Sequence, residues 1–202
     1  MTNNLNKKVV AKNVLPAVLI LSLSLACAAE TQTWQIDPNH TAAQFSVRHL
    51  GISTVRGVFE KTTGTVNYDP ANPAKTTIEA TIDANTLNTR VQMRDNDLRS
   101  PHFLDVAKYP TLTFKSTSAE TAGSGHLKIT GDLTIHGVTK QVVLETEGPS
   151  QPIQDPMGKG MRTGANATTK INRNDFGITT MPGVVGDEVQ IVLDIELTRP
   201  AK

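Results

Sequence analysis

The sequence predicts an all-β protein, an eight-stranded antiparallel barrel with a short helical insertion between strands. Three observations support this class. Apolar and polar residues alternate with a period of two along most of the chain, as in half-buried antiparallel strands. There are eight such segments, mostly joined by short turns. No internal repeat, charge block or low-complexity linker divides the 202 residues into two domains.

The eight expected strands begin at residue 43 and end at residue 199. In chain order they cover residues 43–49, 54–68, 76–84, 111–117, 125–135, 141–147, 164–172 and 187–199. A two-sheet sandwich is the alternative arrangement. We favour the barrel because several strands are long and contain glycines, such as Gly57 and Gly64, where a sheet can bend at a corner. Eight strands enclose just enough room for side chains or one small ligand.

Two segments between the strands lack the alternation. Residues 90–98 combine charges with long straight side chains and predict a short helix, and Ser100–Pro101 begins a second turn. The other segment, residues 148–162, is rich in Pro and Gly. Its length makes it a candidate flap over an opening of the barrel.

The first 28 residues have the organisation of a secretory signal. Three lysines precede an acid-free apolar run, and small residues follow in the pattern A-x-A. We predict cleavage after Ala28, a single mature domain over residues 29–202 and a periplasmic location. Acylation of Cys27 is the less favoured alternative, because Ser24 and Leu25 do not fit the residues that usually precede a lipoprotein cysteine. The apolar run is shorter than the roughly 20 residues of a spanning helix, and we expect no membrane span.

Charge and motif content exclude several functions. Cleavage removes three lysines and no acid, leaving a net charge of −2 and no basic run with interleaved aromatics, so nucleic acid is not an expected partner. The five histidines lie in none of the spacings typical of metal sites, and the mature chain has no cysteine. No nucleophile motif or phosphate-binding loop is present. We therefore predict no cofactor, no metal ligands and no catalytic residues, while a metal site assembled from distant strands stays open.

His136 lies at a break in the alternation, in the sequence IHGVTK. It is either a site residue at the lip of the barrel or part of a hairpin. The spacing predicts a two-residue turn in which Gly137 comes first, as a type II′ turn prefers, and which places His136 beside Thr139. A position in the hairpin is sufficient to explain His136 without a role in a site.

The apolar strand faces contain few large side chains. Aromatic residues make up 4% of the chain, and the inward positions include Ala43, Ala80, Ala165 and Gly131. A packed core uses larger residues at such places. The pattern therefore favours an under-filled interior that holds a ligand, with a barrel filled by its own phenylalanines as the alternative.

Five motifs, in order along the chain, resemble those of the YceI-like family of periplasmic, lipocalin-like, polyisoprenoid-binding proteins. They are WQIDPNHTAAQFSVRHLGISTVRGVFEKTTGTV, LRSPHFLDVAKYPTLTFKST, GDLTIHGVTKQVVL, INRNDFGI and VGDEVQIVLDIEL, and they span Trp34 to Leu197. In this family HGVTK resembles a structural hairpin signature. The resemblance implies a lipocalin-like barrel whose apolar lumen holds a long-chain lipid.

The resemblance also implies which residues contact the lipid. They are apolar residues of the motifs and one histidine, namely Phe45, Val47, His49, Phe59, Phe103, Phe114, Phe176 and Ile178, with Leu112, Leu193 and Met93 beside them. The sequence departs from the family pattern at Met157, where Trp is common, and at Ala165, where Phe is common. A flexible Met and a small Ala predict a wider pocket at the flap end.

Three functional hypotheses use this barrel. The first is a binding or carrier protein for a long-chain isoprenoid, a quinone or a fatty amphiphile. The second is an enzyme that acts on a lipid inside the barrel, for which His49 is the best acid or base. The third is an envelope stress or redox accessory protein with a structural lipid. We favour the first, and leave the identity of the lipid and the oligomeric state open, with a homodimer as one alternative.

Overall fold

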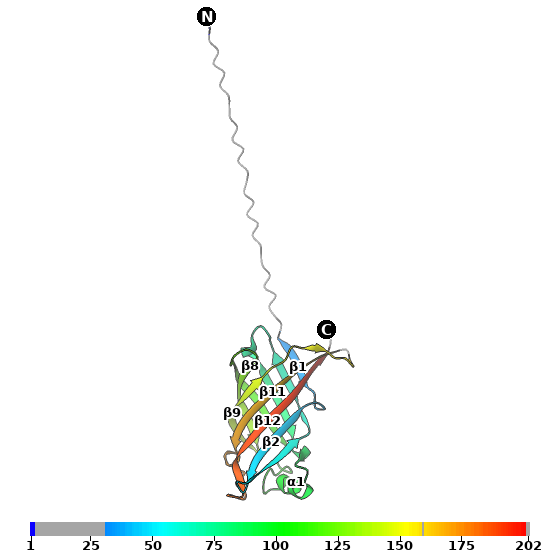
Figure 1. Cartoon of the computed structure of the whole chain (residues 1–202), viewed down its shortest axis with the longest axis vertical. Helices are drawn as coiled ribbons and strands as arrows, with labels where there is room; N and C mark the ends of the chain where they lie inside the picture. The colour runs from blue at the N-terminus through cyan, green and yellow to red at the C-terminus, as the bar shows by residue number, and fades with distance from the viewer. Residues whose placement is uncertain (3–30, 159, 201–202) are drawn as a thin grey trace.

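The computed structural model describes residues 1–2, 31–158 and 160–200. Antiparallel strands form a barrel, and helix α1 (Gln92–Arg99) lies at one end of it (Figure 1). Nearly all of the predicted signal peptide lies outside the described residues, so its cleavage stays a prediction. Within the described residues, no helix is long and apolar enough to cross a membrane.

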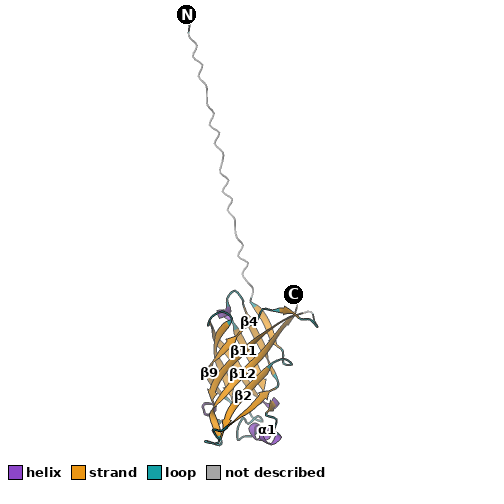
Figure 2. Ribbon diagram, viewed as in Figure 1, coloured by secondary structure: helices purple, strands orange, loops and turns teal. Residues whose placement is uncertain are grey.

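Strands make up most of the described chain, and helical segments lie between a few of them (Figure 2). The strands are β1 (Gln32–Ile36), β2 (Ala42–His49), β3 (Ser53–Phe59), β4 (Thr62–Tyr68), β5 (Thr77–Asp83), β6 (Leu87–Asn88), β7 (Thr111–Thr121), β8 (His126–Ile135), β9 (Val138–Glu147), β10 (Ile153–Gln154), β11 (Gly160–Asn172) and β12 (Val185–Pro200). Three short 3-10 helices, η1 (Pro73–Lys75), η2 (Ala84–Thr86) and η3 (Arg173–Phe176), accompany them.

The strands close into a barrel with eight positions in its wall. Two of these positions are each occupied by two strands that follow one another along the chain. β1 and β2 follow one another along the same edge of β12, and β4 and β3 pair with them on the other side. β5, β7, β8, β9 and β11 continue the antiparallel sheet. β11 then pairs with β12 from Gly160–Pro200 to Asn172–Glu188, which closes the ring. The prediction of an eight-stranded antiparallel barrel is confirmed.

Between β1 and β2 the chain bulges from the wall. Ile36 is paired with Leu197 of β12 and Ala42 with Asp194, so five residues of one strand, 37–41, face two residues of the other. Such a bulge bends the strand and turns side chains away from the regular ladder. The alternation in the sequence predicted β2 but not the short strand β1 before this bulge.

Two glycines make room for aromatic rings on the inner wall. A Cβ on Gly57 would lie 2.4 Å from Phe45 Cζ, and one on Gly131 would lie 2.4 Å from Phe114 Cζ. The strand predicted over residues 54–68 is interrupted neither at Gly57 nor at Gly64, since the break between β3 and β4 falls at residues 60–61. The missing side chain at Gly131 leaves no gap, because a ring from the neighbouring strand occupies the space.

The insertion between β6 and β7 covers one end of the barrel. α1 agrees with the predicted helix, and Asp95 on it accepts hydrogen bonds from the backbone amide and hydroxyl of Thr89, which fixes the start of the insertion. Phe103 belongs to the largest buried cluster of the barrel, and Leu98 and Leu104 pack against it. The insertion therefore forms an apolar cap.

The turn between β8 and β9 differs by one residue from the prediction. His136 and Gly137 are its two central residues, with φ angles of 53° and 75°. Two positive φ angles define a type I′ turn, so the predicted type II′ turn with Gly137 first is wrong. His136 Nδ1 lies 3.3 Å from the carbonyl oxygen of Phe176, and its ring packs edge-on against Tyr109. These contacts make His136 part of the turn's architecture, as predicted.

Candidate binding cavity

The interior of the barrel contains a cavity of about 220 Å³. Its wall consists mainly of aliphatic and aromatic side chains that point inward from the strands and from the cap. On the side away from α1 the interior is packed, because Trp34 and Leu197, which are 1% and 2% exposed, form a layer with Ile36 and Val66. The open space therefore lies on the α1 side of this layer.

Most of the residues that the sequence indicated as lining do line this cavity. They are Phe45, Val47, Phe59, Phe103, Leu112, Phe114, Phe176, Ile178 and Leu193. They come from strands, from the cap and from the segment after β11, so the fold brings together residues that are up to 148 positions apart. Their contact with a lipid stays a prediction.

Two of the indicated residues lie elsewhere, and their placement in the lining is corrected. Met93 is 81% exposed, because α1 turns this side chain away from the barrel. His49 is the last residue of β2, where the pairing with β12 becomes irregular, and it is half-exposed and outside the lining. Strand alternation predicts the face of a residue but not whether the cavity extends as far as the strand end.

Several lining residues gave no periodic signal in the sequence. Leu98 and Leu104 reach the cavity from the cap, and Val185 reaches it from the start of β12. Arg173 is buried and is the one ionisable side chain among the lining residues that the structure describes. Its guanidinium donates to the carbonyl oxygens of Ile178, Thr180, Val185 and Gly186 and pairs with Asp187. Its role is to hold the chain between η3 and β12.

The Pro/Gly-rich segment 148–162 does not cover this cavity. Part of it forms β10, which pairs with β11, and none of its described residues contributes to the lining. The segment instead borders a separate groove of about 690 Å³, whose lining mixes polar and apolar residues and includes Ala165. Met157 is 96% exposed. The expectations of a flap and of a pocket widened by Met157 and Ala165 are therefore wrong.

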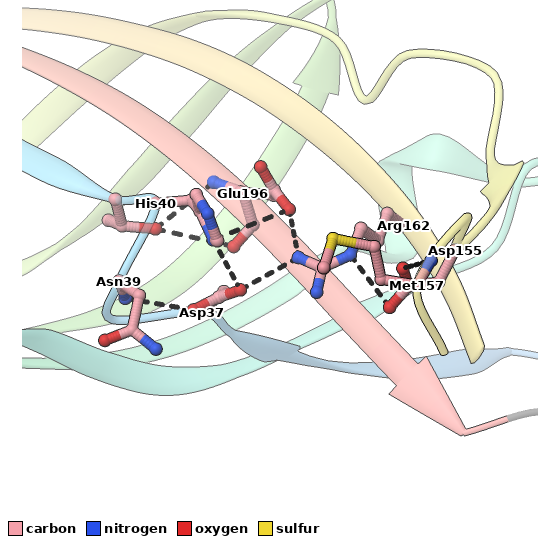
Figure 3. A network of polar contacts seen from close by, with 8 residues as sticks. Asp37, Asn39, His40, Asp155, Met157, Arg162 and Glu196 are labelled. Atoms are coloured by element: carbon pink, nitrogen blue, oxygen red, sulfur yellow. Dashed lines mark hydrogen bonds and ion pairs between the residues drawn. The ribbon is translucent and has the colours of Figure 1, made fainter. Parts of the chain in front are cut away.

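A polar network joins the bulge to β11 and β12 beside this groove (Figure 3). Asp37 Oδ2 accepts a hydrogen bond from Arg162 Nη1 at 2.9 Å and lies 2.9 Å from His40 Nδ1. Arg162 also pairs with Glu196, and its Nε lies 3.0 Å from Asp155 Oδ2. The guanidinium of Arg162 thus connects β11 with the bulge, with β12 and with the segment that follows β10.

The network shifts the pKa values of its members. The hydrogen bond with His40, the backbone amide of Asn39 and Arg162 together lower the pKa of Asp37 to about 2, against the opposing effect of burial. The hydrogen bond to Asp37, aided by the charge of Glu196, raises the pKa of His40. Glu196, Asp37 and Asp155 raise the pKa of Arg162.

Asp37, His40 and Glu196 also have the donor types of a metal site, with ligand atoms within 4.8 Å of one another. Arg162 donates to both carboxylates, so they already share a cationic partner. A metal ion would have to displace this guanidinium, and the network is better explained as structural. The sequence spacing of the histidines did not show the grouping, because Glu196 comes from the far end of the chain.

The fold and the cavity define an antiparallel barrel with an apolar interior. The chain belongs to the YceI-like family, since the YceI-like domain matches residues 34–197. Protein YceI of Salmonella arizonae is 40% identical over 187 residues, which cover 92% of this chain and 96% of that protein. A UPF0312 protein of Vibrio cholerae is 39% identical over 172 residues, which cover 84% of this chain and 90% of that protein.

Solved structures share the fold. The YCEI protein of Campylobacter jejuni is 31% identical, with a TM-score of 0.66, and the match covers 75% of this chain and 89% of that one. BcnA of Burkholderia cenocepacia has a TM-score of 0.69 at 24% identity, covering 80% of this chain and 98% of that one. A polyisoprenoid binding domain from Saccharophagus degradans has a TM-score of 0.62 at 15% identity, covering 83% and 98%. The last two likenesses concern the fold alone.

Proposed function

We propose that the protein is a periplasmic carrier that holds the chain of a long isoprenoid or a similar amphiphilic lipid in its cavity. The observation that carries this proposal is the chemistry of the cavity wall. The lining is almost entirely hydrocarbon, and the donors of Arg173 are directed to backbone carbonyls rather than to the cavity. A site of this kind has no means of recognising a polar molecule, but it suits a hydrocarbon chain.

The energetics of burial fit such a ligand. Each methylene group that leaves water contributes about 0.8 kcal/mol, so a chain of moderate length binds well without polar contacts. A quinone tail or a fatty chain satisfies the same requirement. The name of the Saccharophagus degradans domain, which refers to polyisoprenoid binding, supports an isoprenoid as the first ligand to test.

The wall of the cavity favours binding over catalysis. Among the described lining residues there is no carboxylate and no imidazole, and His49, the acid or base of the enzyme hypothesis, lies outside. A guanidinium such as that of Arg173 stays protonated and cannot act as a base at ordinary pH. The accessory-protein hypothesis predicts a barrel whose stability barely changes when lipid is removed.

The first experiment is native mass spectrometry of the protein purified from a periplasm, followed by solvent extraction. We expect one long-chain isoprenoid, quinone or fatty amphiphile per chain, and a lower melting temperature after delipidation. A protein that is empty and also takes up none of these lipids would contradict the carrier function. Recovery of the protein from the cytoplasmic fraction would contradict the location.

A pair of adjacent substitutions tests the cavity itself. Ala80 lines the cavity, whereas its neighbour Thr81 is exposed on the other face of β5. Ala80→Phe fills part of the cavity and should reduce lipid content at least tenfold in a protein that still folds. Thr81→Phe adds the same ring outside and should keep wild-type lipid content. Equal lipid content in the two variants would contradict the placement of the lipid.

A further inference from the structure

The end of the barrel next to α1 is built from three segments that hydrogen bonds connect. We call residues 50–52, 91–106 and 177–184 the cap end. The amide of Leu50 donates to the carbonyl oxygen of Val184 at 2.7 Å. The hydroxyl of Thr180 donates to the carbonyl oxygen of His102. The turn between β2 and β3, the insertion and the loop before β12 therefore form one surface, at the lower end of the barrel in Figure 1.

The cap end presents apolar side chains in two directions. Leu98, Leu104 and Ile178 line the cavity from it. On the outside, Ile52 is 80% exposed and Met93 81%. With Leu50, Val91 and Met181 they make five of the eight large apolar side chains that are exposed between residues 31 and 200. Such a concentration at one end marks an interaction surface rather than scattered surface residues.

Basic side chains flank these apolar residues. Arg48, Arg56 and Arg90 are exposed, and none of them has an acidic partner among the described residues. Of the acids in and beside the cap end, Asp95 is buried and Asp187 pairs with Arg173. Asp97 contacts His102, and Asp105 has no basic partner among the described residues. Free cations beside exposed apolar side chains complement an anionic lipid surface, where the cations meet headgroups and the apolar groups enter the acyl region.

The volume and position of the cavity also indicate that a bound lipid enters and leaves through the cap end. Its volume of about 220 Å³ lies below the roughly 300–1,000 Å³ of pockets that hold drug-sized ligands, so a long chain needs space that the inner face of the cap occupies. The opposite side is filled by the layer of Trp34 and Leu197. The cap segments can separate without breaking the sheet, because they lie between strands.

We propose that the cap end docks on an anionic lipid bilayer and that the cavity exchanges its lipid with the membrane while docked. The exchange rests on the proposed carrier function, whereas docking does not. A second copy of the chain is a poorer partner for this surface, since a symmetric pairing would bring the arginines of the two cap ends together.

Vesicle flotation tests the docking, with phosphatidylcholine vesicles that contain phosphatidylglycerol. Ile52→Ser/Met93→Ser removes the two most exposed apolar side chains of the cap end. The matched control is Ile153→Ser/Met157→Ser, because these two residues are also exposed, at 60% and 96%, but lie on the segment around β10 at the other end. We expect the cap-end variant to lower the vesicle-bound fraction at least tenfold, the control to bind like wild type, and added salt to weaken wild-type binding.

Two results would overturn the docking proposal. One is wild-type flotation of the cap-end variant in a protein with an unchanged melting temperature. The other is a dimer, seen by analytical ultracentrifugation, that only the cap-end variant loses, which would identify a second copy as the partner. Exchange is then measured as transfer of a fluorescent isoprenoid from loaded protein to vesicles, and its rate should rise with vesicle concentration. A protein that docks but carries no lipid would refute the carrier function alone.

Discussion

The ring of Phe45 lies over Gly57, the residue directly opposite it on the neighbouring strand. The same ring packs against Phe59, with the two ring centroids 5.7 Å apart. The absence of a Cβ at this glycine on the inner face therefore provides the space for the aromatic ring of the neighbouring strand. This arrangement lets a chain with few aromatic residues build a continuous apolar wall.

Gly57→Ala should destabilise the barrel by about 1–3 kcal/mol, because the new methyl group overlaps Phe45 Cζ and Cε1 and the wall must shift. Chemical denaturation measures the change in the free energy of unfolding. Phe45→Leu should reduce the cost of Gly57→Ala, since it removes these two ring atoms, although Thr89 still lies 2.8 Å from the added Cβ. An equal cost in both backgrounds would contradict the pairing.

The strands were predictable because alternation depends only on which face of each residue meets water. Each of the eight predicted segments overlaps a strand, although the one predicted over residues 54–68 is divided into β3 and β4, and their number agrees with the eight-stranded barrel. The bulge at residues 37–41 was not predictable, because its form depends on pairing with β12 more than 150 residues away. The type of the turn at His136 also could not be read from spacing, since two registers of the same hairpin fit the sequence equally well.

Strand alternation predicted the cavity where strands form it, whereas in the cap only the family resemblance indicated a lining residue, Phe103. Phe45 and Phe114 follow from alternation, whereas Leu98 and Leu104 lie in an insertion without a period of two. Arg173 was missed for a different reason. A charged residue is not expected among lining residues, because burying an unpaired charge is costly. Only the chain that folds back over Arg173 supplies the carbonyl oxygens that permit its burial.

His136 offers a test of turn architecture against ligand contact. Its φ of 53° is one that Asn adopts readily and a β-branched residue does not. His136→Asn should keep the lipid content and nearly all the stability, whereas His136→Val should cost about 1–2 kcal/mol. Thermal melts and mass spectrometry of the extracted lipid measure both quantities. A folded Asn variant that had lost its lipid would assign His136 to the binding site.

Arg173→Met should destabilise the protein by about 3 kcal/mol or more, because three buried or partly buried carbonyl oxygens lose their donor at once. The control is Lys170→Met on β11, three residues before Arg173, which removes an exposed pair with Glu188 and should cost less than about 1 kcal/mol. Urea denaturation compares the two variants. Similar costs would show that Arg173 does not hold the loop before β12.

The network around Asp37 predicts how stability depends on pH. The pKa of Asp37 is lowered from 3.8 to about 2 in the folded protein, so its contribution is complete above pH 3.8 and is lost as the pH falls toward 2. The pKa of His40 is raised above 6.5, so its contribution is complete below pH 6.5 and is lost as the pH rises through the raised value. The network should therefore stabilise the barrel most between about pH 4 and 6.5.

His40→Gln isolates the alkaline part of this dependence. We expect the difference in melting temperature between wild type and this variant to be largest near pH 5 and to shrink as the pH rises toward 9, because only the charged imidazole stabilises the carboxylates. His126→Gln is the matched control, since His126 is exposed, contacts the carbonyl oxygen of Ser124 and has no acidic partner among the described residues. A difference that stays constant from pH 5 to 9 would show that the charge of His40 does not stabilise the bulge.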